Sequence, residues 1–254
     1  MSHPSPSEDR AAAPGVLPIL LLLGRPASGK SELIDFMENT PAAERARRYH
    51  LGTLRIVDDF PILWEKFIED DAWERATGAR LYSCCADGNY RVSDDRIWPF
   101  LTEMLRREAE AALAQGTTGQ TLIVEFSRGQ VCGYRDALPQ LSSEILERAA
   151  ILYVDVPFEE SWRRNVARYD EKRKAGILTH SVPREEMERT YAKDDWREIA
   201  PNDSGHLSVA GCDVPYVRMN NNPELVERPA LDLRYHGALD ALFRLRLSSQ
   251  KASR

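Results

Sequence analysis

The chain has 254 residues and carries 40 acidic against 34 basic side chains, which gives a formal net charge of -6. This length is sufficient for one well-buried α/β domain, and the acidic balance argues against a nucleic-acid-binding surface. The four cysteines show neither zinc-ligand spacing nor a disulfide framework. We expect the adjacent pair Cys84 and Cys85 to be reduced thiols, with a redox role as the alternative.

The N-terminal region predicts no targeting segment. Residues 1–15 are rich in serine, proline, alanine and charge, which is typical of a disordered tail. The apolar run that follows, Ile19–Leu23, is too short to cross a bilayer. The segment before it is not net positive and no small-residue cleavage site follows, so the run does not resemble a signal peptide. We therefore expect a soluble, cytoplasmic protein that binds no membrane, with one domain over residues 16–254.

A phosphate-binding motif follows the apolar run directly. The sequence from Gly24 to Ser31, GRPASGKS, matches G-x-x-x-x-G-K-[ST] between an expected strand and an expected helix. The two glycines allow backbone amides to point at phosphate oxygens, and the helix adds the positive end of its dipole. Lys30 is expected to reach the β- and γ-phosphates, and Ser31 to ligate Mg²⁺. The alternative is an ordinary glycine turn. The predicted nucleotide-binding residues of this loop are Gly24, Arg25, Pro26, Ala27, Ser28, Gly29, Lys30 and Ser31.

Expected strands and helices alternate along the rest of the chain. The strands are predicted at Ile19–Leu23, Thr53–Val57, Thr121–Glu125, Ala150–Val156 and Val214–Met219. Helices are predicted at 32–38, 62–76, 99–115, 134–149, from Pro157 onward, at 184–199 and at 231–247, whereas residues 81–92 indicate an irregular loop. Alternation of this kind predicts right-handed crossovers and a parallel sheet covered on both faces. We therefore predict a three-layer α/β fold of the P-loop NTPase type, with a five-stranded parallel sheet and a helical lid at about residues 163–200.

Polar side chains follow several of the expected strands, at the edge of a parallel sheet where ligands bind. Asp58 and Asp59 come after the second strand, Glu125 closes the third and Asn221 follows the fifth. Glu125 is suited to hold Mg²⁺, and Asp58 or Asp59 to accept the proton of an attacking hydroxyl. Because successive strand residues face opposite ways, we expect only one of the two aspartates to face the cleft. The alternative for this pair is a solvated turn.

A dense basic set occupies the expected helix after the fourth strand. Arg164 and Arg168 are four residues apart, so they share a helix face and could stabilise a transferring phosphoryl group. The alternative is a solvated basic surface. The set comprises Arg163, Arg164, Arg168, Lys172, Arg173 and Lys174.

These motifs together resemble the P-loop small-molecule kinases related to adenylate kinase and uridine kinase. Glu125-Phe126-Ser127-Arg128 resembles the Asp-Gly-Phe-Pro-Arg of adenylate kinases and the Glu-Arg-Ser of deoxynucleoside kinases. Asp58-Asp59-Phe60 is similar to the Asp-Asp-Phe of uridine and nicotinamide riboside kinases, in which an aspartate is the base. Arg164 to Arg168 looks like the Arg-x-x-x-Arg that leads into the lid. Met219-Asn220-Asn221 resembles the segment beside the adenine. Residues 61–92 match neither nucleotide-binding pattern.

The motifs and the resemblance predict an ATP-dependent kinase that uses Mg²⁺ and a small-molecule, nucleoside- or nucleotide-like acceptor. The lack of an Asn-Lys-x-Asp motif favours ATP over GTP. The alternatives are a nucleotide-binding regulatory module and an ATP hydrolase. Residues 24–31, Arg164 and Asn221 would bind the nucleotide, and Ser31 with Glu125 the metal ion. The predicted catalytic residues are Lys30, Asp58, Asp59, Arg128, Arg164 and Arg168.

Overall fold

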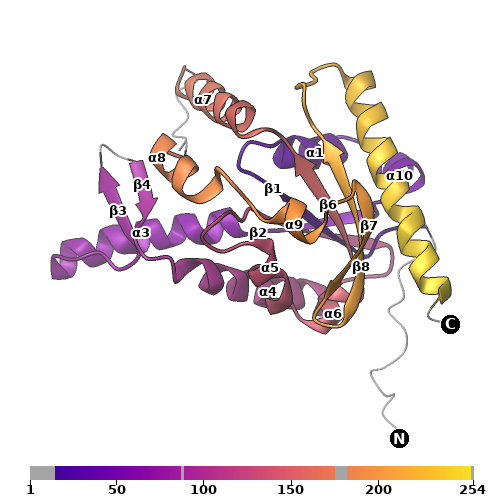
Figure 1. The fold of residues 1–254 in the computed structure, drawn as a ribbon, viewed down its shortest axis with the longest axis horizontal. Coiled ribbons are helices and arrows are strands. Elements are labelled where there is room, and N and C mark those ends of the chain that lie inside the picture. The colour runs from indigo at the N-terminus through magenta and orange to yellow at the C-terminus, as the bar shows by residue number, and fades with distance from the viewer. Residues whose placement is uncertain (1–14, 87–88, 175–181, 253–254) are drawn as a thin grey trace, which may run out of the picture.

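The computed structural model describes residues 15–86, 89–174 and 182–252. In these residues six strands form a central sheet in the order β2-β5-β1-β6-β8-β7, and a separate hairpin pairs β3 with β4 (Figure 1). The strands are β1 (Ile19–Gly24), β2 (Thr53–Asp58), β3 (Ser83–Ala86), β4 (Asn89–Val92), β5 (Gln120–Phe126), β6 (Ala149–Asp155), β7 (Ser204–Val209) and β8 (Cys212–Asn220).

Helices connect most of these strands and form the two outer layers. They are α1 (Lys30–Glu38), α2 (Ala42–Tyr49), α3 (Asp59–Thr77), α4 (Ile97–Ala114), α5 (Tyr134–Ala137), the 3₁₀ turn η1 (Leu138–Gln140), α6 (Ser143–Leu146), α7 (Phe158–Lys174), α8 (Arg184–Glu186), the π-helical turn η2 (Met187–Tyr191), α9 (Trp196–Ile199) and α10 (Arg228–Ala252).

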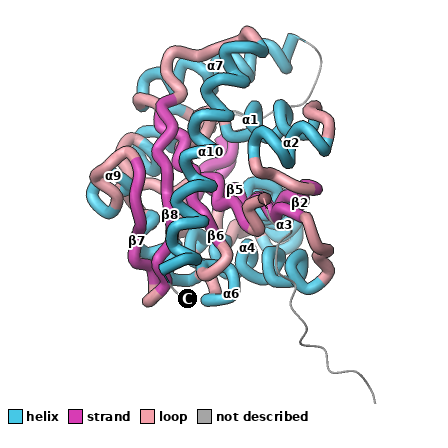
Figure 2. Tube along the Cα trace, turned by 90° about the vertical axis from the view of Figure 1, so that its right-hand side faces the viewer, coloured by secondary structure: helices cyan, strands magenta, loops and turns pink. Residues whose placement is uncertain are grey.

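The sheet separates two hydrophobic cores, which is the three-layer arrangement that the sequence predicts. Ile19, Leu21 and Leu23 of β1 contribute to the core under α4, α5 and α6. Leu20 and Leu22 contribute to the opposite core, under α1, α2 and α10. Figure 2 shows α10 lying along β8 and β6 on that second face. Because helices cover both faces, the central strands β1, β5 and β6 are buried along almost their whole length rather than on alternate residues.

The prediction of five parallel strands is confirmed, but the prediction of a five-stranded sheet is wrong by one strand. β2, β5, β1, β6 and β8 are parallel, and β7 adds an antiparallel edge by pairing with β8. The two strands are joined by a tight turn in which Ala210 and Gly211 both have positive φ, of 48° and 84°. β7 is a half-exposed edge strand with alternating polar and apolar residues, so it lacks the long apolar run by which the other strands are recognised.

Several predicted element boundaries also need correction. Residues 81–92 contain the hairpin β3–β4 rather than an irregular loop. Helix α4 begins at Ile97, because Pro99 lies in its first turn, where a proline breaks no helical hydrogen bond. Helix α2 was not predicted, since its sequence AAERARRY is mostly polar and buries only Arg45 and Tyr49.

Two long predicted helices are broken into short pieces by tertiary contacts. The range 134–149 forms α5, η1 and α6 instead of one helix, with Pro139 inside the 3₁₀ turn. The range 184–199 forms α8, η2 and α9. The carboxylates that break it are Asp194, which accepts from Tyr153 Oη at 2.8 Å, and Asp195, which accepts from the amide of Tyr134 at 2.8 Å. These bonds to distant segments compete with helical continuation.

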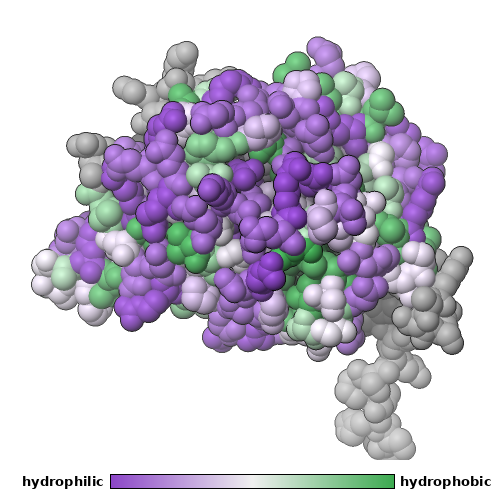
Figure 3. Space-filling view, in the orientation of Figure 1, coloured by the Kyte–Doolittle hydropathy of each residue, from purple (hydrophilic) through white to green (hydrophobic). Residues whose placement is uncertain are grey.

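Some predictions fall outside the described residues, namely most of the N-terminal tail and residues 175–181 of the expected lid. Within the described part, all four cysteines are free thiols. None of the helices described there is both long enough and apolar enough to span a bilayer. The face in Figure 3 is largely hydrophilic, with apolar side chains in small patches.

Candidate active site

The loop between β1 and α1 lies at the carboxyl edge of the sheet, between the neighbouring strands β5 and β6. Gly29 precedes α1 with a left-handed backbone at φ 104°, and a Cβ there would stand 2.2 Å from the side-chain nitrogen of Asn221. The first helical bond is donated by the amide of Leu33 to the carbonyl of Gly29, at 3.1 Å. The amides of Lys30 and Ser31 therefore precede the helical bonding pattern and are available to an anion.

The ammonium group of Lys30 is buried inside the curve of this loop. Nζ donates to the carbonyl oxygens of Gly24 at 3.0 Å and Arg25 at 2.9 Å, and to the hydroxyl of Ser127 at 2.8 Å. It also lies 3.9 Å from Oε1 of Glu125. Burial lowers the pKa of Lys30, while Glu125 and the aspartates opposite raise it. A cation is thus placed at the centre of the loop, next to the end of β5.

Asn221, which follows β8, holds the loop between β1 and α1 in place through hydrogen bonds. Its side-chain nitrogen donates to the carbonyl of Ser28 at 2.8 Å, and its side-chain oxygen accepts from Arg234 at 2.6 Å. Arg164 on α7 donates to the main-chain oxygen of Asn221 at 2.8 Å and to Glu160 at 2.8 Å. Asn221 and Arg164 are therefore positioned by one another as part of the wall that supports the loop.

Two further contacts fix the ends of the loop. Arg25 donates to the carbonyls of Tyr191 at 2.9 Å and Val156 at 3.0 Å, and it pairs with Asp194 at 3.0 Å. The buried hydroxyl of Tyr134 accepts from the amide of Gly24 at 3.1 Å and from that of Arg128 at 3.3 Å. The ends of β1 and β5 are joined through this one phenol.

Carboxylates of two neighbouring strands face Lys30. Asp58 ends β2 and is paired in register with Glu125 of β5, so the two side chains lie next to each other on the same side of the sheet. Burial raises the pKa of Glu125 to about 7, against the opposing effect of Lys30. Burial, together with the charge of Asp59, raises the pKa of Asp58 to about 6. Both carboxyl groups are therefore poised to exchange a proton near neutral pH.

Asp59 is held differently from Asp58. It is the first residue of α3 and forms an ion pair with Arg128, which is buried and also donates to Thr102 at 2.8 Å. Asp58 caps the same helix by accepting from the amide of Phe60 at 3.0 Å, and no ion pair involves it among the described residues. Both aspartates line the cavity, contrary to the expectation that only one would, because the chain leaves the strand geometry at Asp59.

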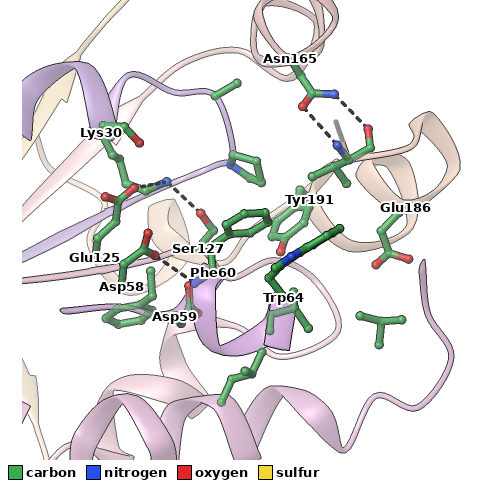
Figure 4. Close-up of a pocket in the computed structure, with 18 of the residues that line it drawn as sticks. Lys30, Asp58, Asp59, Phe60, Trp64, Glu125, Ser127, Asn165, Glu186 and Tyr191 are labelled. Atoms are coloured by element: carbon green, nitrogen blue, oxygen red, sulfur yellow. Dashed lines mark hydrogen bonds and ion pairs between the residues drawn. The ribbon is translucent and has the colours of Figure 1, made fainter. Parts of the chain in front are cut away.

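A cavity of about 310 Å³ opens between the loop and the helices α3 and α4. In Figure 4, Lys30, Asp58 and Glu125 lie at one side of it, and Trp64, Tyr191 and Glu186 lie towards the other. Aromatic side chains dominate the part remote from the loop. They are Phe60, Trp64 and Phe67 of α3, Tyr90 of β4, Trp98 of α4 and Tyr191 of η2.

Some of the predicted site residues line the cavity and others do not. Those that line it are Pro26, Ala27, Gly29, Lys30, Ser31, Asp58, Asp59 and Glu125. Among the described residues, those that do not are Gly24, Arg25, Ser28, Arg128, Arg164 and Asn221. The side chain of Arg168 lies outside the described residues.

The aromatic wall is the part of the cavity that the sequence did not indicate. Tryptophans in an apolar helix are typical of core packing, so the sequence by itself does not indicate that these rings line a cavity. The available signal was the spacing of Phe60, Trp64 and Phe67, which places three rings on one face of a helix that begins directly after Asp58-Asp59.

The residues present are compatible with a magnesium ion held chiefly by phosphate and water. In the described part of the chain, no three His, Cys, Asp or Glu residues form a metal-binding group. Magnesium in phosphoryl-transfer sites typically takes only one or two protein oxygens and completes its shell with phosphate oxygens and water. Ser31 and Glu125, which both line the cavity, supply a hydroxyl and a carboxylate of this kind.

Comparisons with known proteins do not place the chain in a protein family. No protein-family model matches the chain, and no curated protein matches it either. Among solved structures, a sugar kinase from Janibacter sp. HTCC2649 is 16% identical, covers 87% of this chain and 94% of its own, and has a TM-score of 0.41. The protein TT1252 from Thermus thermophilus is 14% identical, covers 89% of this chain and 97% of its own, and has a TM-score of 0.37. At this level of similarity the neighbours do not determine the activity of this chain.

Proposed function

We propose that the protein is an ATP-dependent phosphotransferase that moves the γ-phosphate to a hydroxyl group of a small molecule. The observation that carries this proposal is the continuity of one cavity. Lys30, Asp58 and Glu125 lie at its loop end, and an aromatic chamber lies beyond them. A protein that only bound or hydrolysed ATP would need the loop and the carboxylates but no second chamber.

The loop would bind the triphosphate through its backbone and through Lys30. The amides at the start of α1 and the positive end of its dipole favour phosphate oxygens. The left-handed Gly29 lets the backbone approach closely, since a side chain there would collide with Asn221. Ser31 and Glu125 would hold Mg²⁺, which when bound neutralises charge on the β- and γ-phosphates.

Asp58 is the residue best suited to accept the proton of the acceptor. Its carboxylate lines the cavity and has no ion-pair partner in the described part of the chain, whereas that of Asp59 is bound by Arg128. As the acceptor O–H bond breaks, the proton passes to Asp58 and the oxygen forms a bond to the γ-phosphorus. The bond between the γ-phosphorus and the bridging oxygen breaks, and ADP leaves with that electron pair. Positioning and charge would supply most of the catalysis.

The test is ADP release by the purified protein with ATP and Mg²⁺, across a panel of nucleosides, nucleotides, sugars and aryl alcohols. We expect at least one acceptor to raise ADP release above the rate without acceptor. Lys30→Ala should abolish that increase, and Arg47→Ala, an exposed cation on α2, should leave it unchanged.

Each rival function predicts a different result in the same assay. An ATP hydrolase would release ADP at one rate whatever acceptor is added. A regulatory module would bind ATP and release no ADP with any compound. A Lys30→Ala variant that bound and turned over ATP like the unaltered protein would contradict all three functions, because each needs the loop.

A further inference from the structure

The chamber beyond the carboxylates has a preformed aromatic wall. The rings of Phe67 and Tyr90 are stacked, with centroids 5.1 Å apart and planes at 4°. The indole of Trp64 meets Tyr90 edge-on, at 5.2 Å and 89°. Because these rings pack on each other across α3 and β4, they form a firm surface that can hold a flat ring by stacking.

Carboxylates, rather than cations, supply most of the charge in this cavity. Lys30 is the only lysine or arginine that lines it among the described residues, and it lies at the loop end. The acidic side chains that line the cavity are Glu32, Asp58, Asp59, Glu125 and Glu186.

Three arginines on elements that border the chamber are already paired with carboxylates. Arg189 binds Asp95 at 2.7 Å and Glu186 at 3.1 Å, and Arg128 is bound to Asp59. Arg91 on β4 is paired with Glu185. A phosphomonoester carries close to two negative charges and is typically bound by arginines that can donate to it in pairs. No arginine lines the cavity among the described residues, and the carboxylates of the cavity would repel the ester.

Trp98 brings a buried polar donor to the chamber wall. Its indole N–H forms no hydrogen bond with the described residues, although Trp98 lines the cavity. A buried donor without an acceptor is costly, and native structures normally satisfy such groups. A ring carbonyl or ring nitrogen of a bound molecule is an acceptor of the right kind.

We infer that the acceptor subsite takes a phosphate-free alcohol bearing a flat ring, and that it rejects the phosphate ester of the same compound. The inference rests on the proposed function, because it assigns the second substrate of that site. The ring lies against Trp64, Phe67 and Tyr90, and the reacting hydroxyl lies at Asp58. The chemical class therefore includes nucleosides and aryl alcohols, and excludes nucleoside monophosphates and sugars that carry no flat ring.

The experiment measures binding and needs no turnover. The protein is saturated with Mg²⁺ and a non-hydrolysable ATP analogue, and ligands are titrated by calorimetry. The panel contains the four ribonucleosides and 2-phenylethanol, their phosphate esters, and ribose and gluconate, which have no flat ring. We expect the tightest ligand to be a phosphate-free ring alcohol, about tenfold or more tighter than ribose, because ring stacking contributes that much. Its phosphate ester should bind more weakly.

Two tryptophans of the same helix provide a matched pair of variants. Trp64→Leu should weaken binding of the ring alcohol about tenfold while the ATP analogue binds as before. Trp73→Leu removes an indole that is 48% exposed and does not line the cavity, so it should change neither affinity.

The outcomes separate this inference from the proposed function. The inference is overturned if a phosphate ester or a ligand without a flat ring binds most tightly, or if no alcohol with a flat ring binds. An ester that is preferred in the unaltered protein but not in Arg168→Ala would assign acceptor binding to Arg168. If alcohols with a flat ring bind but none raises ADP release, the subsite stands and phosphotransfer fails. If a sugar without a flat ring raises ADP release most, phosphotransfer stands and the subsite assignment fails.

Discussion

Asp58 and Glu125 are register partners on the neighbouring parallel strands β2 and β5, and this pairing places two buried carboxyl groups side by side in front of Lys30. Each carboxyl group is desolvated, which raises its pKa towards neutrality. The site therefore brings together two groups that change charge within the pH range of a cell.

The first prediction concerns the pH dependence of activity. The base and the metal ligand must both be ionised, and their pKa values are raised to about 6 and about 7. We expect kcat/KM, which reports the free enzyme, to fall as the pH is lowered through this interval and to be level above it. The measurement is the initial rate at saturating Mg²⁺ and constant ionic strength. A rate that stayed constant down to pH 5 would show that neither carboxylate takes part.

The second prediction concerns stability and follows from the same pKa of Asp58. A carboxyl group whose pKa is raised by folding binds its proton more tightly in the native state. The free energy of unfolding therefore falls as the pH rises from 3.8, the ordinary pKa of an aspartate, to about 6. Asp58→Asn removes this loss, so the variant should be about 1–3 kcal/mol more stable than the unaltered protein at pH 8 and equally stable at pH 4. Asparagine also caps helices, which preserves α3.

Urea unfolding at the two pH values measures this difference. Asp94→Asn is the matched control with the opposite sign, because Arg96 lowers the pKa of Asp94 to about 2. That variant should lose stability at neutral pH rather than gain it. Equal stability of Asp58→Asn and the unaltered protein at pH 8 would mean that Asp58 is not desolvated as described.

The third prediction concerns the loop. Gly29→Ala places a methyl group 2.2 Å from the side-chain nitrogen of Asn221, at a φ that L-residues rarely adopt. We expect affinity for ATP to fall at least tenfold, because the loop must move to relieve the contact. Gly78→Ala is the control, since Gly78 also has positive φ but has open space around it, and it should cost about 1–2 kcal/mol of stability only.

A second variant tests the cause of the Gly29→Ala effect. Asn221→Ala removes the colliding atom. When Asn221→Ala is already present, Gly29→Ala should therefore lower the affinity for ATP by less than it does in the unaltered protein. Calorimetric titration with ATP in the absence of acceptor measures all four proteins. Additive losses in the double variant would exclude the collision as the cause.

The fourth prediction concerns the buried ion pair beneath the aspartates. Arg128→Met leaves the carboxylate of Asp59 without its partner in a buried position, and this should destabilise the protein by about 3–5 kcal/mol. Adding Asp59→Asn removes the unpaired charge and should restore part of that loss. The readout is a double-mutant cycle in urea. Arg47→Ala, which removes an exposed cation of α2, should change stability little. A similar small effect for Arg128→Met would contradict the burial of the pair.

The local features of this protein follow from its sequence. Five apolar runs predict five parallel strands, because a strand covered on both faces must be apolar throughout. The loop from Gly24 to Ser31 is equally local, since its glycines, Lys30 and Ser31 act within a few residues of one another. The position of Asp58 and Glu125 at the sheet edge also follows from the strand ends alone.

Only the tertiary structure decided which of these side chains are held and which face the cavity. Arg128, which the sequence predicts to be catalytic, lies buried against Asp59 of α3 and Thr102 of α4, two residues that are 43 positions apart in the sequence. The edge strand β7 and the breaks at Asp194 and Asp195 depend on partners far along the chain. The aromatic chamber forms only where α3, β4 and α4 meet. A sequence pattern shows the spacing of apolar residues within one helix or strand. These features depend on contacts between elements, and the spacing within one element does not specify such contacts.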